Sequence, residues 1–204
     1  MRKVLSLIVV LVFASATACA QQELAEPQDG DIVFHESKSE QSPIIKLAQQ
    51  SKWTHCGIVF HIGEKAYVYE ASNTVKFTPL KEWIARGKDG VYCAKRLKTP
   101  LSAPAISKMK SVGAKYKGKP YDKWFQWSDN KMYCSELVWK IYTQGADIEL
   151  CTPEQFSDFN LSAPGVKKLI KERYGDSFDA SERIVSPQAL YKSELLKEVR
   201  YPGL

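Results

Sequence analysis

The sequence predicts an α+β fold in which an antiparallel sheet packs against helices. Residues 53–62 are rich in β-branched and aromatic side chains, which is typical of a buried strand. A second strand is expected at residues 66–72, and the short connection Gly63-Glu64-Lys65 predicts that the two form a hairpin. Apolar side chains recur at helical spacing in residues 131–142. These strands and this helix face predict a core between a sheet and helices.

The remaining elements follow from apolar periodicity and from turn residues between the periodic segments. Further strands are expected at residues 31–35 and 91–97. Proline and glycine delimit the predicted helices, which cover residues 43–50, 79–86, 103–116 and 131–144, with three short helical pieces in the tail at 153–159, 165–174 and 187–199.

The first twenty residues have the pattern of an export signal. A positive start, Arg2-Lys3, precedes a short apolar core and a run of small residues. Cleavage before Gln21 is favoured. A competing cleavage before Cys19 would give a lipid anchor, but this site lacks the large aliphatic residue usual three positions earlier. The apolar run is too short to span a membrane.

We therefore expect a signal peptide at residues 1–20, a leader at 21–28 and one domain at 29–204. The expected location is the bacterial periplasm or another part of the cell envelope.

The charge of the chain bears on which partners the protein binds. The formal net charge is +6, and it falls to about +4 when the export signal is removed. The lysines are dispersed and are not interleaved with stacking aromatics, so nucleic-acid binding is not expected. A mildly basic surface is compatible with anionic wall polymer or with peripheral membrane contact. No segment identifies a partner protein.

Four cysteines remain after the export signal. An even number in an exported protein permits two disulfides, so a disulfide-stapled envelope protein is one alternative. None of the spacings is CxxC, and the sequence implies no metal site and no organic cofactor. The four are Cys56, Cys93, Cys134 and Cys151.

Cys134 is the candidate nucleophile. It lies at the expected start of the helix in residues 131–144, where the polar residues Ser128-Asp129-Asn130 can cap free amides. The helix dipole favours thiolate over thiol at such a position. The alternative is a buried structural cysteine, a common fate of this residue type.

His55 and Glu70 are candidates for its partners. Alternation along residues 53–62 places His55 on the face opposite Cys56. The hairpin would return Glu70 to the level of His55, on the same face, where a carboxylate would orient the imidazole. The alternatives are a histidine that merely ends its strand and a solvated glutamate at the strand edge.

Five short motifs, in this order, resemble the YiiX/YebB-like cysteine hydrolases, circularly permuted members of the NlpC-type papain-like superfamily. The resemblance covers roughly residues 29–145, and the histidine strand precedes the cysteine helix, as in the permuted class. The motifs are Gly30-Asp31-Ile32-Val33-Phe34, Thr54-His55-Cys56-Gly57-Ile58-Val59, Tyr69-Glu70-Ala71, Lys119-Pro120-Tyr121-Asp122 and Tyr133-Cys134-Ser135-Glu136-Leu137-Val138.

The resemblance implies a circularly permuted papain-like fold with Cys134 as nucleophile, His55 as general base and Glu70 as the group that orients the histidine. Cys56 stands where an aliphatic or small residue is expected, and alternation assigns it to the core. Candidate cleft-lining residues are Tyr121, Asp122 and Tyr133, by the same resemblance, and Trp124, from an aromatic cluster at residues 124–127 that must line a core or a groove.

The expected activity is hydrolysis of an acyl bond, amide or ester, in a cell-wall peptide or a lipid. Two alternatives stay open. One is a lipid-directed acyltransferase, and the other is a non-catalytic ligand-binding module on a papain-like scaffold.

Overall fold

The computed structural model describes residues 23–204. The predicted export signal and both of its cleavage sites lie outside this part of the chain. In the described part, a seven-stranded sheet has the order β1-β9-β6-β2-β3-β4-β5. Its strands are β1 (Glu23–Leu24), β2 (Ile32–His35), β3 (His55–Ile62), β4 (Lys65–Ala71), β5 (Val75–Pro79), β6 (Tyr92–Leu97) and β9 (Leu196–Arg200).

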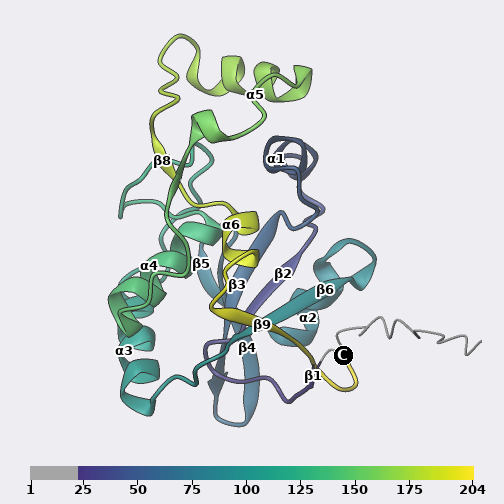
Figure 1. Ribbon diagram of the computed structural model, residues 1–204, viewed down its shortest axis with the longest axis vertical. Coiled ribbons are helices and arrows are strands. Elements are labelled where there is room, and N and C mark those ends of the chain that lie inside the picture. Colours follow the sequence, from purple (N-terminus) through teal and green to yellow (C-terminus); the bar gives the residue numbers. More distant parts are fainter. Residues whose placement is uncertain (1–22) are drawn as a thin grey trace, which may run out of the picture.

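Helices cover both faces of this sheet, with α3 and α4 on one flank and α2 on the other (Figure 1). A separate two-stranded pair joins β7 to β8. These elements are α1 (Ser42–Gln49), α2 (Leu80–Arg86), α3 (Ala103–Ala114), α4 (Cys134–Ala146), α5 (Pro164–Tyr174), α6 (Pro187–Tyr191), β7 (Glu154–Gln155) and β8 (Arg183–Ile184), with 3-10 turns at Lys88–Gly90 and Phe156–Asp158.

The predicted hairpin is confirmed. β3 and β4 pair antiparallel, with Ile58 opposite Tyr69 and Val59 opposite Val68. Strand β2 pairs antiparallel with both β3 and β6, so the histidine strand lies inside the sheet. Only β1 runs parallel to its neighbour, β9, among the pairs of the described sheet.

Alternation divides the apolar side chains of β3 and β4 between two cores. Ile58 and Tyr69 belong to the larger core, together with side chains of α3 and α4. Val59 and Val68 belong to a smaller core that α2 covers with Trp83 and its apolar neighbours. The sheet thus separates the side that receives α4 from the side that receives α2, as a strand period of two requires.

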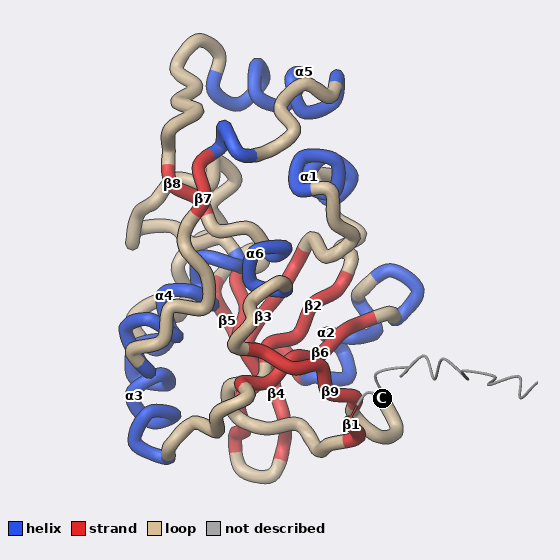
Figure 2. Tube along the Cα trace, viewed as in Figure 1, coloured by secondary structure: helices blue, strands red, loops and turns tan. Residues whose placement is uncertain are grey.

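Helices α1 and α5 pack against each other beyond the end of the sheet, at the top of the view in Figure 2. Proline in the first turn starts both helices, where its missing N–H costs no hydrogen bond. No helix in residues 23–204 is long and apolar enough to cross a membrane.

Two expectations about the tail are wrong. The tail segment 187–199 is not one helix, because α6 ends at Tyr191 and the chain then enters β9. Segment 153–159 forms β7 and a 3-10 turn. The expected leader contains β1, which adds to the sheet beside β9. Pairing with a distant strand decided these segments, and local periodicity cannot register such a partner.

Candidate active site

Cys134 lies in the first turn of a helix, as the sequence predicted, but α4 begins at Cys134 itself and not at residue 131, and the predicted cap is wrong. The residue before it, Tyr133, stays extended, and its N–H donates to the Glu136 carboxylate at 3.4 Å. Asp129, one of the residues expected to cap the helix, instead pairs with Lys140 at 2.8 Å. Residues 129–131 form bends and Met132 bridges to Tyr121, so the helix begins only at Cys134.

His55 and Glu70 meet as the hairpin predicted. The His55 Nε2 atom lies 2.6 Å from the Glu70 Oε2 atom, and both side chains are buried. Gly57 permits the close approach of the two strands, since a Cβ there would lie 2.4 Å from the Val68 side chain and 3.3 Å from the Glu70 Cβ. The bond to Glu70 leaves Nδ1 as the ring nitrogen available to a thiol.

Three further donors hold the Glu70 carboxylate. Thr78 Oγ1 donates to Oε1 at 2.6 Å, while Trp83 Nε1 and Arg86 Nη2 donate to Oε2 at 3.0 and 2.5 Å. Burial opposes ionisation of Glu70, but the His55 ring and the Arg86 guanidinium outweigh it and hold the pKa of the carboxyl well below its usual range. Glu70 is therefore a fixed anion behind His55.

Cys134 and His55 shift each other's protonation. Hydrogen bonding to the Cys56 thiol lowers the pKa of Cys134; burial opposes this, and the His55 ring lowers the pKa further, so that it lies well below its usual range. Burial would lower the pKa of His55, but the Cys134 thiolate and the Glu70 carboxylate raise it to about 9. The pair therefore favours thiolate and imidazolium, the reactive form of a cysteine–histidine pair.

Cys56 is buried in the larger core, as alternation predicted. It has a second role that alternation did not reveal, because its thiol and its main-chain N–H both act on the Cys134 sulfur. Burial raises the pKa of the Cys56 thiol well above its usual range, so Cys56 remains a neutral neighbour of the thiolate.

His35 is a residue of this region that the sequence analysis did not single out. It pairs with His55 across β2 and β3, and the two rings stack at 5.2 Å. On its other side it stacks on Trp83 at 3.9 Å. Burial, with the positive charges of His55 and Arg86, lowers the pKa of His35 to about 3. A neutral ring thus covers His55. In the sequence, His35 ends one strand and His55 begins another, so antiparallel pairing of these two strands brings the two rings together.

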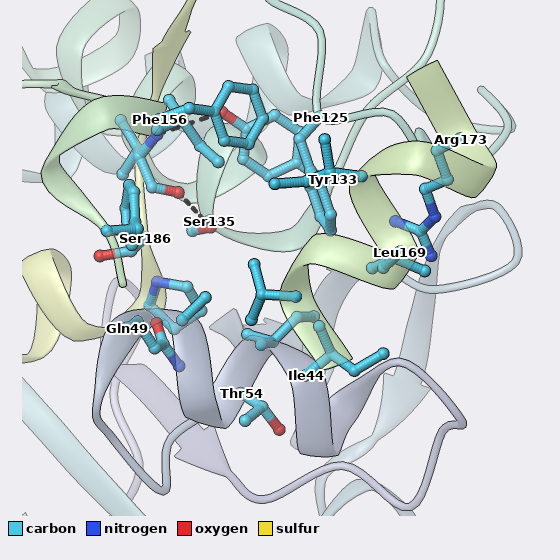
Figure 3. A pocket seen from close by; sticks show the side chains of 18 of the residues that line it. Ile44, Gln49, Thr54, Phe125, Tyr133, Ser135, Phe156, Leu169, Arg173 and Ser186 are labelled. Carbon is cyan, nitrogen blue, oxygen red and sulfur yellow. Dashed lines mark hydrogen bonds between the residues drawn. The ribbon is translucent and has the colours of Figure 1, made fainter. Parts of the chain in front are cut away.

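An apolar pocket opens on Cys134 between α1 and α5. The empty space within it, with the part that is open to solvent included, is about 750 Å³. Ile44 of α1, Leu169 of α5 and Tyr133 are among the residues that line it (Figure 3). Two of the expected cleft residues, Tyr121 and Tyr133, line this pocket.

The other two expected cleft residues do not line it. Asp122 is buried and accepts main-chain N–H bonds from Trp124 at 2.9 Å and Gln126 at 2.7 Å, which fixes the aromatic turn. Trp124 is 39% exposed, and its indole N–H donates to the Arg173 carbonyl. Phe125, from the same aromatic cluster, lines the pocket instead.

The described residues contain neither a disulfide nor a group of metal ligands. Cys56, Cys93, Cys134 and Cys151 are all free thiols. In residues 23–204, no three His, Cys, Asp or Glu side chains gather in a way that could hold a metal ion.

Comparison with known families decides the class. Residues 26–200 match the model of the permuted papain-like amidase enzymes YaeF/YiiX, the C92 family. The chain belongs to this permuted papain-like amidase family. Its fold is the permuted papain-like fold that the sequence motifs implied, and it is a cysteine hydrolase of the amidase type.

Two relatives are similar over nearly their whole length. YiiX of Escherichia coli strain K12, described as uncharacterized, is 40% identical over 193 residues, which are 95% of this chain and 94% of YiiX. The crystal structure of YiiX from Escherichia coli O157:H7, described as a metalloprotein, has a TM-score of 0.83 at 41% identity and covers 86% of this chain and 98% of that one.

Proposed function

We propose that this hydrolase cleaves acyl bonds with Cys134 as nucleophile, His55 as general base and acid, and Glu70 as the residue that orients His55. The observation that carries the proposal is the placement of Cys134 at the start of α4 next to a buried His55, whose Nε2 atom lies 2.6 Å from the Glu70 carboxylate. The lowered pKa of Cys134 and the raised pKa of His55 agree with this placement. A non-catalytic binding module would have no need of a buried thiolate–imidazolium pair, which is costly to maintain without a function.

The reaction follows the chemistry of a thiolate at a helix start. The Cys134 thiolate attacks the acyl carbon, and the N–H of Cys134, the first residue of α4, is a donor for the developing oxyanion. His55 then protonates the leaving amine or alcohol, and the acyl group remains on sulfur as a thioester. Neutral His55 takes a proton from water as the water oxygen attacks the thioester; the C–S bond breaks, the carboxylic acid leaves, and the Cys134 thiolate and protonated His55 are restored.

The apolar pocket supports a substrate with a long hydrocarbon acyl group. Its wall is built largely from Ile, Leu, Val and Phe side chains of α1, α5 and the loops around them, and Cys134 is one of the lining residues. A wall peptide in the same place would bury amides and carboxylates without partners, at about 1–3 kcal/mol for each unpaired group. A lipid amide or lipid ester therefore fits this site better than a wall peptide.

The description of one relative as a metalloprotein does not transfer to this site. The carboxylate beside His55 is already bound by Arg86, whose positive charge opposes a cation there. Because the described residues offer no set of three ligands, they do not fit a bound metal ion, and no step of the proposed reaction uses one.

Hydrolysis of a fatty-acyl amide tests the proposal. Purified protein should release dodecanoic acid from an N-dodecanoyl amine, and Cys134→Ala should lower the rate by about 10³-fold or more, because the nucleophile is lost. Cys151→Ala is the matched control, since Cys151 is a free thiol that is not in the pocket. Circular dichroism should show that both variants fold. Turnover that survives in Cys134→Ala would refute the assignment of the nucleophile.

A further inference from the structure

A second, polar cavity lies on the His55 side of the candidate site. It encloses about 1680 Å³ of space, part of it open to solvent. His55 is part of its wall, whereas Cys134 is part of the wall of the apolar pocket. We call it the polar cleft. The residues on which the following argument rests are Lys38, Glu40, Lys76, Arg86, Lys123 and Arg173.

The polar cleft carries an excess of positive charge. Five of its lining residues are lysine or arginine, and one, Glu40, is acidic. Arg86 is neutralised by Glu70. For Lys38, Lys76, Lys123 and Arg173, residues 23–204 supply no carboxylate within ion-pair distance. Cations gathered in a concave site attract anions more strongly than cations on a convex surface do.

The two cavities meet at shared residues. Thr54, Tyr121 and Arg173 line both of them. At this border Arg173 Nη2 donates to Gln41 Oε1 at 3.0 Å, and Gln41 Nε2 donates to the Tyr121 hydroxyl at 3.2 Å. The two cavities therefore lie next to each other, with Cys134 in the wall of the apolar pocket and His55 in the wall of the polar cleft.

The direction of the reaction assigns each cavity a part of the substrate. In acyl transfer the acyl group stays with the nucleophile, and the leaving group departs on the side of the general acid. The acyl chain thus belongs to the apolar pocket beside Cys134, and the leaving group belongs to the polar cleft beside His55.

Building on the proposed function, we propose that the leaving group is anionic, so that the substrate is an acyl compound whose amine or alcohol part carries a carboxylate or phosphate. The Cys134 sulfur forms a bond to the acyl carbon as the bond from that carbon to nitrogen or oxygen breaks. The His55 proton passes to the departing atom, and water later cleaves the thioester to the free fatty acid.

Two matched substrate pairs test the proposal. The first is N-dodecanoyl glutamate against its neutral diamide, and the second is N-dodecanoyl-O-phosphoethanolamine against N-dodecanoylethanolamine. Release of dodecanoic acid is measured below the critical micelle concentrations. We expect kcat/KM to be about tenfold higher for the anionic member of at least one pair, and the difference to shrink as salt screens the charges. The pair with the larger ratio identifies carboxylate or phosphate as the recognised group.

Lysine variants locate the effect. Lys76 lies opposite Glu70 in the register of strands β4 and β5, which places it next to the proposed site. Lys76→Gln and Lys123→Gln should each lower the anionic-to-neutral ratio of kcat/KM by about three- to fivefold, the size of one partly screened charge interaction. Lys65→Gln, an equal change of charge at an exposed residue outside the polar cleft, should leave the ratio unchanged.

The failures are distinguishable. Equal rates for both members of both pairs, or faster cleavage of the neutral members, would overturn the anionic leaving group and leave the proposed function intact. No hydrolysis of any of the four compounds would overturn the proposed function and this inference with it. A ratio that falls as much in Lys65→Gln as in Lys76→Gln would refute the polar cleft as the binding site.

Discussion

Strand β3 carries a histidine–carboxylate pair at each end, and the two pairs differ in almost everything except their local chemistry. His55 Nε2 lies 2.6 Å from Glu70, and His61 Nδ1 lies 2.7 Å from Asp29. Both histidines follow the same alternation along the strand. The two distances alone do not distinguish a candidate catalytic base from a histidine in a surface ion pair.

Their surroundings separate them. The side chains of His55 and Glu70 are 10% and 0% exposed, against 33% and 17% for His61 and Asp29. A thiol faces His55, whereas the ammonium of Lys110 binds the carboxylate of the second pair at 2.5 Å. Burial makes each charge interaction stronger because water screens it less. The comparison teaches that two features distinguish a histidine–carboxylate pair that can serve as a general base: the pair is buried, and a thiol lies next to the histidine ring.

The largest expected effect is the difference in activity between variants of the two histidines. His55→Ala should lower the rate of hydrolysis by about 10³-fold or more, because the base that forms the thiolate and the acid that protonates the leaving group are both lost. His61→Ala, at the other end of the same strand, should keep the rate within about twofold, as a substitution outside the catalytic pair does. Steady-state kinetics with an N-dodecanoyl amine measures both. A His61→Ala defect as deep as that of His55→Ala would remove the distinction.

The two carboxylates should differ by less. Glu70→Gln should lower kcat by about 10- to 100-fold, because the amide keeps the shape but no longer favours the charged His55 ring. Asp29→Asn should leave kcat unchanged and cost about 0.5 kcal/mol of folding free energy, as a partly exposed ion pair does. Kinetics and urea unfolding give the two values. An unchanged kcat in Glu70→Gln would show that Glu70 does not orient His55.

The smallest effect, and the sharpest test of the charge state, is the pH dependence of alkylation. Because the pKa of Cys134 is held well below its usual range, iodoacetamide should modify it quickly below the ordinary thiol pKa of about 8.5. Burial raises the pKa of Cys93 and Cys151 to about 12, so these thiols are internal controls. Peptide mapping identifies the labelled residue. A Cys134 rate that rises only around pH 8.5 would mean an ordinary thiol.

Deprotonation of His55 sets the upper pH limit of hydrolysis. Its pKa is raised to about 9, so hydrolysis should fall above that pH as the ring loses the proton that it gives to the leaving group, while alkylation continues. The raised pKa also stabilises the fold. That contribution is fully present below the unfolded histidine pKa of about 6.5 and is lost as the pH rises through about 9.

Sequence reasoning reached the hairpin and the start of α4 because both depend on neighbours in the chain. Alternation placed Glu70 on the His55 face, and helical spacing placed Cys134 in a first turn, without any knowledge of distant contacts. It could not reach β9, since a segment after a short helix becomes a strand only when β6 offers an edge to pair with. Nor could it place Trp124, whose exposure depends on how α5 packs above it.

By itself the sequence determined the order of the motifs and the residue types for thiol chemistry, and the family comparison bears out the class of enzyme that they implied. Only the tertiary structure decided what surrounds them. It brought Cys56 against Cys134, covered His55 with His35, and set an apolar pocket beside a cationic cleft. The physical reason is range: periodicity acts over a few residues, whereas burial and electrostatics depend on groups that only folding brings together.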